Sequence, residues 1–494
     1  MTVNRNLKKS RPYDQPPKRR RSLIPGGPDS AATGFFVVAA VWLAVATGIG
    51  VLAIGMRLIP FELSVPLGLF DLSFELDGRR VEAAFVNATV FGWLSNAGFA
   101  AIAFMTPRLA GRQLAGERLV TLGMLAWNLA LAGGIAGLYV FDLGPNAPLS
   151  AMLWLFDGGL AFGALIITGS FLATVGAGIR TAYVSTWFAG IALLSLLGMT
   201  GINATIGLAE LFIELPELTV ALISVFVERA ITTLWLLGVA YATLHYVVPR
   251  ATGQPLASAG LGLLAWVTWL AMAPLSALGA LQDPIIPYLI TLLGSVGTIL
   301  LLVPAALTTV NLALSMRGRW SLLFGAGALA FAATALAFLL SVSMLEALGA
   351  LRSVDASVSG TEWELGVFIW AAYGAFTMAA FSIAEHALPR ILRRAWGGGV
   401  LASAQLWLAF GGATLAGLAL MGGGLAEGSM LATGATPEDM DAALVLYRVP
   451  AFLGLGMVAL AGLAMLVNLF LMYTSGEPAD YTVPGQTATA AAGH

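Results

Sequence analysis

The 494-residue sequence contains no cysteine. This absence excludes disulfide bonds, thiolate metal sites, iron–sulfur clusters and covalent haem attachment through a CxxCH motif. Histidine is almost as scarce, with three in the chain, and one of them is the last residue, His494. A site that needs several imidazole ligands therefore has few donors to draw on.

Charged side chains are also rare. They make up 10% of the chain, whereas hydrophobic residues make up 59%, and the mean hydropathy is +0.87. Since a soluble domain carries roughly 25% charged residues, this composition indicates a chain embedded in a membrane. The formal net charge of −2 points to no particular partner, and nucleic acid is not expected as one.

The first 33 residues differ from the rest of the chain. They contain the basic stretch NRNLKKSRPYDQPPKRRR and every lysine in the sequence. The stretch is too polar, and lies too far before the first apolar run, to be an ordinary signal peptide. We predict a disordered cytoplasmic tail at 1–33, which either rests on anionic lipid or acts only as a topology signal. A second flexible cytoplasmic tail is predicted at 474–494.

Twelve apolar runs lie between these tails. Each is about 20 residues or longer, which is enough to cross a bilayer. They predict an all-α membrane protein with a transmembrane domain over 34–473, and its many glycines suit close helix packing. The runs are 34–57, 83–106, 119–141, 150–176, 183–206, 219–248, 257–280, 288–313, 321–345, 364–388, 399–421 and 449–473.

The charges between the runs differ from one side to the other. When the basic tail is placed in the cytoplasm, the loops on that side hold most of the remaining arginines. The opposite loops hold mainly acids, such as Asp142, Glu214 and Asp283. Because cytoplasmic loops of membrane proteins carry an excess of Lys and Arg, the pattern predicts that both termini are cytoplasmic.

A Pro-Arg pair recurs at the ends of the second, sixth and tenth runs. The segments are FMTPRLAG, HYVVPRATG and HALPRILRR, and their prolines are Pro107, Pro249 and Pro389. The intervals of roughly 140 residues each hold four runs, which predicts three repeated arcs of four helices. We expect proline to end each of these helices and arginine to anchor it at the inner interface.

Several segments resemble the catalytic subunit I of the haem-copper oxidases, and most of all the C-family (cbb-type) cytochrome c oxidases. They are NATVFGWLSNAGFAAIAFMTPRLAG, YVSTWFAGIALL, LSMRGRW and AAYGAFTMAAFSIAEHALPR. In that order they resemble the family's helix 2, its helix 5, the segment after its helix 8, and its helix 10. The resemblance implies the haem-copper oxidase subunit I fold, with twelve transmembrane helices in three pseudo-repeated arcs of four.

The resemblance also implies two haems and one copper, held by six histidines on helices 2, 6, 7 and 10. This sequence has other residues at those places. The haem-ligand positions fall on Phe85, Val367 and Ile369, and the copper-ligand positions fall near Arg229, Leu275 and Ser276. We therefore predict no haem, no copper and no catalytic residue for this chain by itself.

Two histidines remain in the apolar part, His245 and His386, each shortly before a Pro-Arg pair. Glu385 directly precedes His386, so the two side chains point to different sides of a helix. One interpretation is that these are interfacial polar residues that reach the lipid headgroups. The other is that they handle protons or quinone, because an ionisable residue at membrane depth is a default functional candidate.

Glu228 and Arg229 lie near the outer end of the sixth run, where the resemblance places a copper ligand. Either they sit at the headgroup boundary, or the fixed charge of the arginine stands where the family has metal charge. In the second case we expect Arg229 to pair with a carboxylate from another helix or with Glu228. Asp157, in WLFDGGLAFG, is a further candidate for a buried polar or proton-handling residue.

The sequence thus favours a cofactor-poor subunit I-like protein of a respiratory or related electron-transfer complex in the cytoplasmic membrane of a prokaryote. It would act as a scaffold or as a proton or quinone pathway. Its expected partners are the lipid bilayer, other membrane or cytochrome subunits, and quinone. Two alternatives remain open. One is an active cytochrome c oxidase subunit that reduces oxygen, which the ligand count opposes, and the other is a membrane transporter, for which no paired helix breaks are evident.

Overall fold

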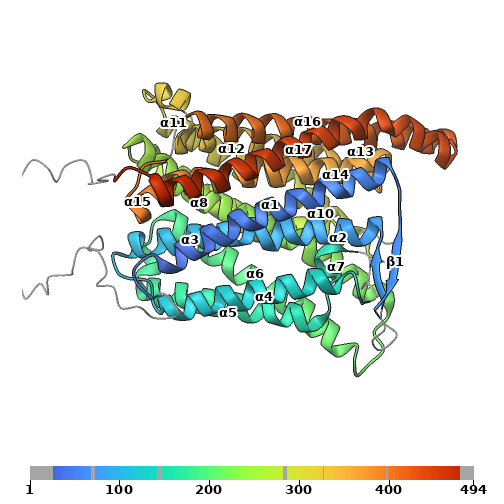
Figure 1. The fold of residues 1–494 in the computed structure, drawn as a ribbon, viewed down its shortest axis with the longest axis horizontal. Coiled ribbons are helices and arrows are strands. Elements are labelled where there is room, and N and C mark those ends of the chain that lie inside the picture. Colours follow the sequence, from blue (N-terminus) through green and yellow to red (C-terminus); the bar gives the residue numbers. More distant parts are fainter. Residues whose placement is uncertain are drawn as a thin grey trace, which may run out of the picture.

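The computed structural model describes residues 26–67, 73–141, 147–281, 286–325, 327–396 and 399–478. Within these ranges, twelve helical segments are long and apolar enough to cross a membrane, as predicted. Figure 1 shows them side by side along the long axis, with the first and last described helices starting and finishing at the same end of the bundle. Most of the predicted tails, 1–33 and 474–494, lies outside the described residues.

Eight of the described spans are single continuous helices, and the eighth span in chain order is built from two successive helices. The single helices are α1 (Ser30–Leu58), α4 (Glu117–Gly137), α5 (Trp154–Val175), α6 (Val184–Ala209), α9 (Ala259–Leu278), α12 (Ala328–Gly349), α16 (Gly399–Thr433) and α17 (Pro437–Ser475). The two-part span is α10 (Tyr288–Leu300) with α11 (Leu302–Ser315).

The second, sixth and tenth spans share an internal feature that the hydrophobic pattern did not predict. Each consists of an α-helix, a π-helical segment and a second α-helix. These composite spans are α2 (Gly78–Asn87), η1 (Ala88–Leu94) and α3 (Ser95–Ala110); α7 (Glu217–Ala230), η4 (Ile231–Leu236) and α8 (Leu237–Thr252); and α14 (Glu362–Ile369), η6 (Trp370–Phe376) and α15 (Thr377–Leu392). Every π-helical segment ends the same number of residues before the Pro-Arg pair, so the repeat extends to local backbone geometry.

The prolines of the three Pro-Arg pairs do not end their helices, and our expectation on this point is wrong. α3, α8 and α15 each continue for three residues past their proline. Proline lacks an N–H but keeps its carbonyl. In each helix that carbonyl accepts a hydrogen bond from the N–H of a left-handed residue that follows the helix. The three left-handed residues are Gly111, Gly253 and Arg393.

The last two helices are longer than the apolar runs predict. α16 and α17 have 35 and 39 residues and include most of 422–448, which the run pattern predicts as a connecting loop. At 1.5 Å per residue they are roughly 50 to 60 Å long, which exceeds the roughly 30 Å hydrocarbon core. Figure 1 shows them projecting beyond the other helices, at the end of the bundle opposite the start of α1. Gly424 and Gly428 bring α16 close to Trp363 and Ser357, because a Cβ at either glycine would meet these neighbours.

A two-stranded antiparallel sheet departs from the predicted all-α pattern. β1 (Leu63–Pro66) pairs with β2 (Ser73–Leu76), with Leu63 opposite Leu76. The sheet lies at the end of the bundle opposite the start of α1 (Figure 1). There the N–H of Glu75 donates to the carbonyl of Tyr139 at 2.7 Å. The other short elements are η2 (Pro148–Ser150), η3 (Gly176–Thr181), η5 (Trp320–Gly325) and α13 (Arg352–Val358).

The three composite spans meet at the centre of the molecule. Trp93 Nε1 donates to Thr377 Oγ1, and Trp235 Nε1 donates to Ser95 Oγ, both at 2.8 Å. These two hydrogen bonds join equivalent positions of neighbouring composite spans. A small cavity of about 20 Å³ lies beside them and is lined by four equivalent residues from each span: Leu94, Ala97, Gly98, Ala101, Leu236, Val239, Ala240, Thr243, Phe376, Ala379, Ala380 and Ile383. The composite spans are therefore related by a pseudo-threefold axis.

Candidate functional site

Phe85 of α2 is buried in aromatic surroundings. Its ring stacks on Tyr373 of η6 with the centroids 6.2 Å apart, and it meets Phe368 of α14 edge-on at 5.9 Å. A Cβ placed on Gly50 of α1 would come within 2.5 Å of the same ring. The ring therefore fills the space between α1, α2 and α14.

The other two residues at predicted haem-ligand positions, Val367 and Ile369, are also buried on α14. The nearby phenol of Tyr373 is already engaged, because its hydroxyl lies 2.8 Å from Thr89 Oγ1 in a hydrogen bond. The N-terminal halves of the second and tenth spans thus meet through rings and aliphatic groups, with one satisfied hydroxyl pair between them.

Arg229 forms an ion pair with Glu346 of α12, with Nη2 and Oε2 2.5 Å apart. The expected carboxylate from another helix is therefore Glu346. The side chains of Arg229 and Glu346 remain 23% and 26% exposed, so the pair lies neither in the dry interior nor fully in solvent. Glu228 is half-buried, and its carboxylate accepts a hydrogen bond from the backbone N–H of Leu149.

Leu275 and Ser276 of α9 contact α10. The hydroxyls of Ser276 and Thr298 share a hydrogen bond of 2.9 Å. A Cβ on Gly297 would come within 2.7 Å of the Leu275 side chain. Leu275 and Ser276 therefore pack in the interface between α9 and α10.

Asp157 lies in the first turn of α5 and is buried. Among the described residues its Oδ1 has no hydrogen-bond partner. A buried carboxylate oxygen without a hydrogen-bond donor costs free energy in a membrane protein, unless the acid is protonated or a water molecule donates to it. Its proposed part in proton handling remains a prediction.

His245 and His386 do not reach the lipid headgroups, so the interfacial interpretation is wrong. Their exposed fractions are 0% and 3%. The His245 ring stacks on Phe188 of α6 with centroids 5.4 Å apart, and its Nδ1 lies 2.9 Å from the carbonyl of Tyr241. The His386 ring meets Phe104 and Tyr246 edge-on. Both imidazole rings pack against aromatic rings of neighbouring helices.

Glu385 is buried beside His386 on α15, and its Oε1 has no partner within the described part of the chain. Across the described ranges, no hydrogen bond or ion pair joins the side chains of any two of the six candidates, Asp157, Glu228, Arg229, His245, Glu385 and His386. The structure therefore places them as separate buried or half-buried groups.

A group of charges that the sequence pattern did not single out links four helices at the end of the bundle near the β-sheet. Glu362 of α14 pairs with Arg448 of α17 at 2.6 Å and with Arg57 of α1 at 3.6 Å. Arg57 also pairs with Glu82 of α2 at 2.6 Å, and Arg448 with Asp441 at 3.1 Å. The Glu362 side chain is only 2% exposed. In the sequence, this group could have been inferred from two arginines that border apolar runs: Arg57 at the end of the first run and Arg448 just before the last.

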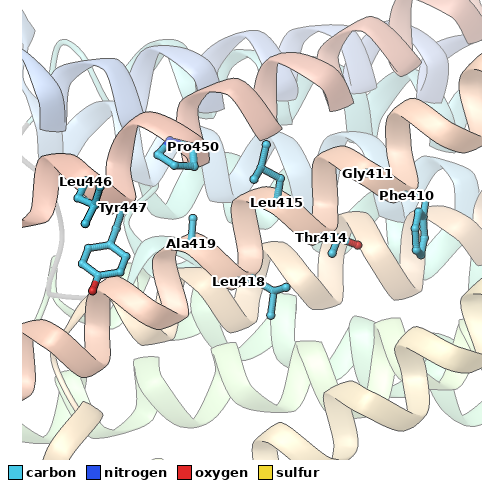
Figure 2. A pocket seen from close by; sticks show the side chains of 9 residues that line it. All are labelled: Phe410, Gly411, Thr414, Leu415, Leu418, Ala419, Leu446, Tyr447 and Pro450. Atoms are coloured by element: carbon cyan, nitrogen blue, oxygen red, sulfur yellow. The ribbon is translucent and has the colours of Figure 1, made fainter.

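An open groove of roughly 500 Å³ lies on the outside of α16 and α17. Figure 2 shows Thr414 and Leu418 of α16 on one wall and Tyr447 and Pro450 of α17 on the other. Its lining is almost entirely apolar. On a bilayer-facing surface such a groove is covered by hydrocarbon, so it does not indicate a water-soluble substrate.

Comparisons with known proteins agree with this architecture. The sequence model of the family described as Cytochrome C and Quinol oxidase polypeptide I matches residues 30–455. The Cbb3-type cytochrome c oxidase subunit CcoN1 of Stutzerimonas stutzeri is 22% identical over 476 residues, which cover 92% of this chain and 97% of that protein. A chain from a haem-copper terminal oxidase dimer solved by cryo-EM is similar with a TM-score of 0.70 at 15% identity, covering 92% of this chain and 86% of that chain.

The fold is thus that of a multi-pass membrane protein of the haem-copper oxidase subunit I type. The chain belongs to the cytochrome c and quinol oxidase polypeptide I family.

The residues at the predicted ligand positions do not fit haem or copper. Haem iron and copper bind imidazole, thiolate, thioether or phenolate donors. Around Phe85 the side chains are aromatic and aliphatic, and the one phenol is paired with Thr89. At the predicted copper position the guanidinium of Arg229 is cationic and has no lone pair to give a metal. No three His, Asp or Glu side chains gather as a metal site within the described ranges.

Proposed function

We propose that this chain is a cofactor-poor subunit I-like membrane subunit of a respiratory or related electron-transfer complex, in which it acts as a scaffold. The observation that supports this most is the packing of Phe85. Its ring occupies the space between α1, α2 and α14 in contact with Phe368 and Tyr373. An axial ligand and a porphyrin would both need that space.

The arrangement of the ionisable residues favours a scaffold over a proton or quinone pathway. A proton path needs donors and acceptors within hydrogen-bond reach of one another or of bridging water. Asp157, Glu385 and His245 instead lie on three different spans, with no described hydrogen bond between their side chains. The chain would then contribute helix surface and shape to the complex.

The proposal includes the location and partners of the chain. It spans the cytoplasmic membrane of a prokaryote with both termini in the cytoplasm, and it binds other membrane or cytochrome subunits. The relative in Stutzerimonas stutzeri is a subunit of a cytochrome c oxidase, which supports a respiratory complex as the setting.

A pyridine haemochrome spectrum and metal analysis of the purified chain test the proposal. We expect no Soret band and no stoichiometric copper, with a b-type cytochrome of known haem content purified in the same detergent as the standard. A ratio of about one haem per chain would overturn the proposal and favour an active oxidase subunit. Pull-down of the tagged chain from its native membrane in mild detergent should recover haem-containing subunits, and recovery of the chain alone contradicts the scaffold role.

A further inference from the structure

The strand β1 and the residues on either side of it carry a strip of exposed apolar side chains. Phe61, Leu63, Val65 and Leu67 occupy every second position, and each is between 43% and 48% exposed. Because successive side chains of a strand point to opposite faces, Leu63 and Val65 lie on the same face of the sheet. We call these four residues the apolar strip. An exposed row of large apolar side chains marks a surface that contacts protein or lipid.

The pairing with β2 shows which way the apolar face points, because directly opposite residues of an antiparallel pair lie on the same face. Leu63 lies opposite Leu76, which packs against buried residues at the end of α1 and the start of α2. Val65 lies opposite Phe74, whose ring stacks on Tyr139 with the centroids 5.6 Å apart. The other edge of β2 is bonded to the carbonyl of Tyr139. The apolar face thus turns toward the helix ends, and β1 is the overhanging strand.

The length of α1 places β1 at the level of the lipid headgroups. α1 has 29 residues, so at 1.5 Å per residue it is roughly 43 Å long, and a bilayer including its headgroups is about 40 to 45 Å thick. β1 begins shortly after α1 ends. Figure 1 shows β1 running across the ends of the helices and not along them. The strand therefore lies along the plane of the membrane, at its surface.

An exposed apolar side of α1 leads to the apolar strip. Val37, Val41 and Val45 lie one turn apart on this side, and each is 41% to 50% exposed. Leu52 and Ile59 continue the same side at intervals of seven residues and are 39% and 75% exposed. Because α1 crosses the membrane, these side chains contact lipid. The lipid contact of α1 therefore continues to the segment that enters β1.

The edge of β1 is poorly suited to pairing with a strand of another chain. Pro60 precedes the strand and Pro66 is its last residue, and neither has an N–H to donate. Short edge strands that contain proline resist the addition of a further strand. This favours lipid over a second copy of the chain or a β-strand of a partner as the occupant of the apolar face.

We propose that the apolar strip is a lipid-binding surface, by which β1 lies on the membrane and inserts its apolar side chains into the leaflet at this end of the bundle. Glu62 and Ser64, which alternate with the strip, face the water. Burial of the strip in the interface of the bilayer anchors the end of α1 and the start of α2 at the membrane surface.

Spin labels on single introduced cysteines test the proposal, since the chain has none of its own. The purified full-length chain carries the label at Val65→Cys, with Ser64→Cys on the opposite face as the matched control. Nanodiscs of phosphatidylcholine that hold one chain each prevent a second copy from covering the strip. Power saturation then compares collisions of the label with oxygen, which concentrates among acyl chains, and with a nickel chelate, which stays in water.

Burying one large apolar side chain favours the inserted position by a factor of about ten or more, so we expect an oxygen-to-nickel collision ratio about tenfold higher at position 65 than at position 64. Equal ratios, with nickel collisions frequent at both positions, would show that the strip faces water and would overturn the proposal. Few collisions of the position-65 label with either reagent would show that protein covers the strip, which also overturns it.

A second pair of variants tests whether the strip itself holds β1 on the membrane. In the chain labelled at Val65→Cys, Leu63→Asp places a charge in the strip, and the control Ser64→Asp places the same charge on the other face. We expect the collision ratio to fall with Leu63→Asp and to stay unchanged with Ser64→Asp. An unchanged ratio with Leu63→Asp, or an equal fall in both variants, contradicts the proposal. Thermal melting in detergent verifies that all the variants fold.

Discussion

At the scale of single residues, the packing around Phe85 shows that protein side chains fill the space at this predicted haem-ligand position. The phenyl ring stacks on Tyr373, meets Phe368 edge-on and has Gly50 behind it, so three other helical segments hold it in place. We expect Phe85→Ala to lower stability by about 3 kcal/mol, because a buried ring lost from a packed core leaves a cavity. Phe470→Ala is the control, since that ring is 64% exposed on α17. Equal melting temperatures for the two variants in detergent would show that Phe85 is not tightly packed.

The Arg229–Glu346 pair allows a test of whether a charged Arg229 destabilises the protein when Glu346 is removed. Glu346→Leu leaves a half-buried guanidinium that cannot lose its proton, and we expect a loss of about 2 kcal/mol. Arg229→Leu should cost less, because a carboxylate left alone can take up a proton.

The double variant Arg229→Leu with Glu346→Leu completes the cycle. If the two groups are coupled, its loss of stability is smaller than the sum of the two single losses. Thermal unfolding of the four proteins in one detergent provides the comparison. Strict additivity would mean that the 2.5 Å contact contributes nothing, and Arg229 would then not depend on a matched carboxylate.

At the scale of the helices, the π-helical segments explain two equivalent contacts between neighbouring spans. A π turn is wider than an α turn and leaves carbonyls without their usual partners. Trp127 of α4 donates its indole N–H to the carbonyl of Phe91 in η1 at 3.0 Å, and Trp269 of α9 does the same to Thr233 in η4 at 2.9 Å. The two tryptophans hold equivalent places in the first and second arcs.

Replacing either indole by phenyl should test this role. Trp127→Phe and Trp269→Phe keep an aromatic ring but remove a buried hydrogen bond to a carbonyl, so we expect each to lower stability by about 1 to 2 kcal/mol. Trp407→Phe is the matched control, because Trp407 is 66% exposed on α16. A loss of the same size in all three would point to ring volume and not to the hydrogen bond.

At the scale of the whole molecule, the distribution of arginines predicts the orientation in the membrane. The absence of cysteine makes it testable with single introduced thiols. Ser359 and Ser321 are exposed in connections at opposite ends of the bundle. In spheroplasts, a membrane-impermeant maleimide should label Ser359→Cys directly and Ser321→Cys only after the membrane is opened. The reverse pattern would place both termini outside.

Much of the architecture could be predicted from the sequence because it depends on local composition. Apolar runs specify the spans, and the recurring Pro-Arg pairs reveal the threefold repeat. The ends of α16 and α17 could not be predicted in this way, because they depend on contacts between helices, such as those of Gly424 and Gly428 of α16 with α14 and α13. The caps after Pro107, Pro249 and Pro389 depend on backbone angles that the residue types leave open.

The sequence by itself determined that this is a membrane protein of twelve spans with too few histidines for the family's ligand set. Only the tertiary structure decided which side chains the remaining polar residues contact. Glu346 is 117 residues from Arg229, and Tyr246 and His386 meet across two arcs of the chain. No local pattern encodes such partners, because they depend on how whole helices rotate and pack. That packing buries the His386 ring edge-on against Phe104 and Tyr246, whereas the sequence left both an interfacial role and a proton- or quinone-handling role open for this residue.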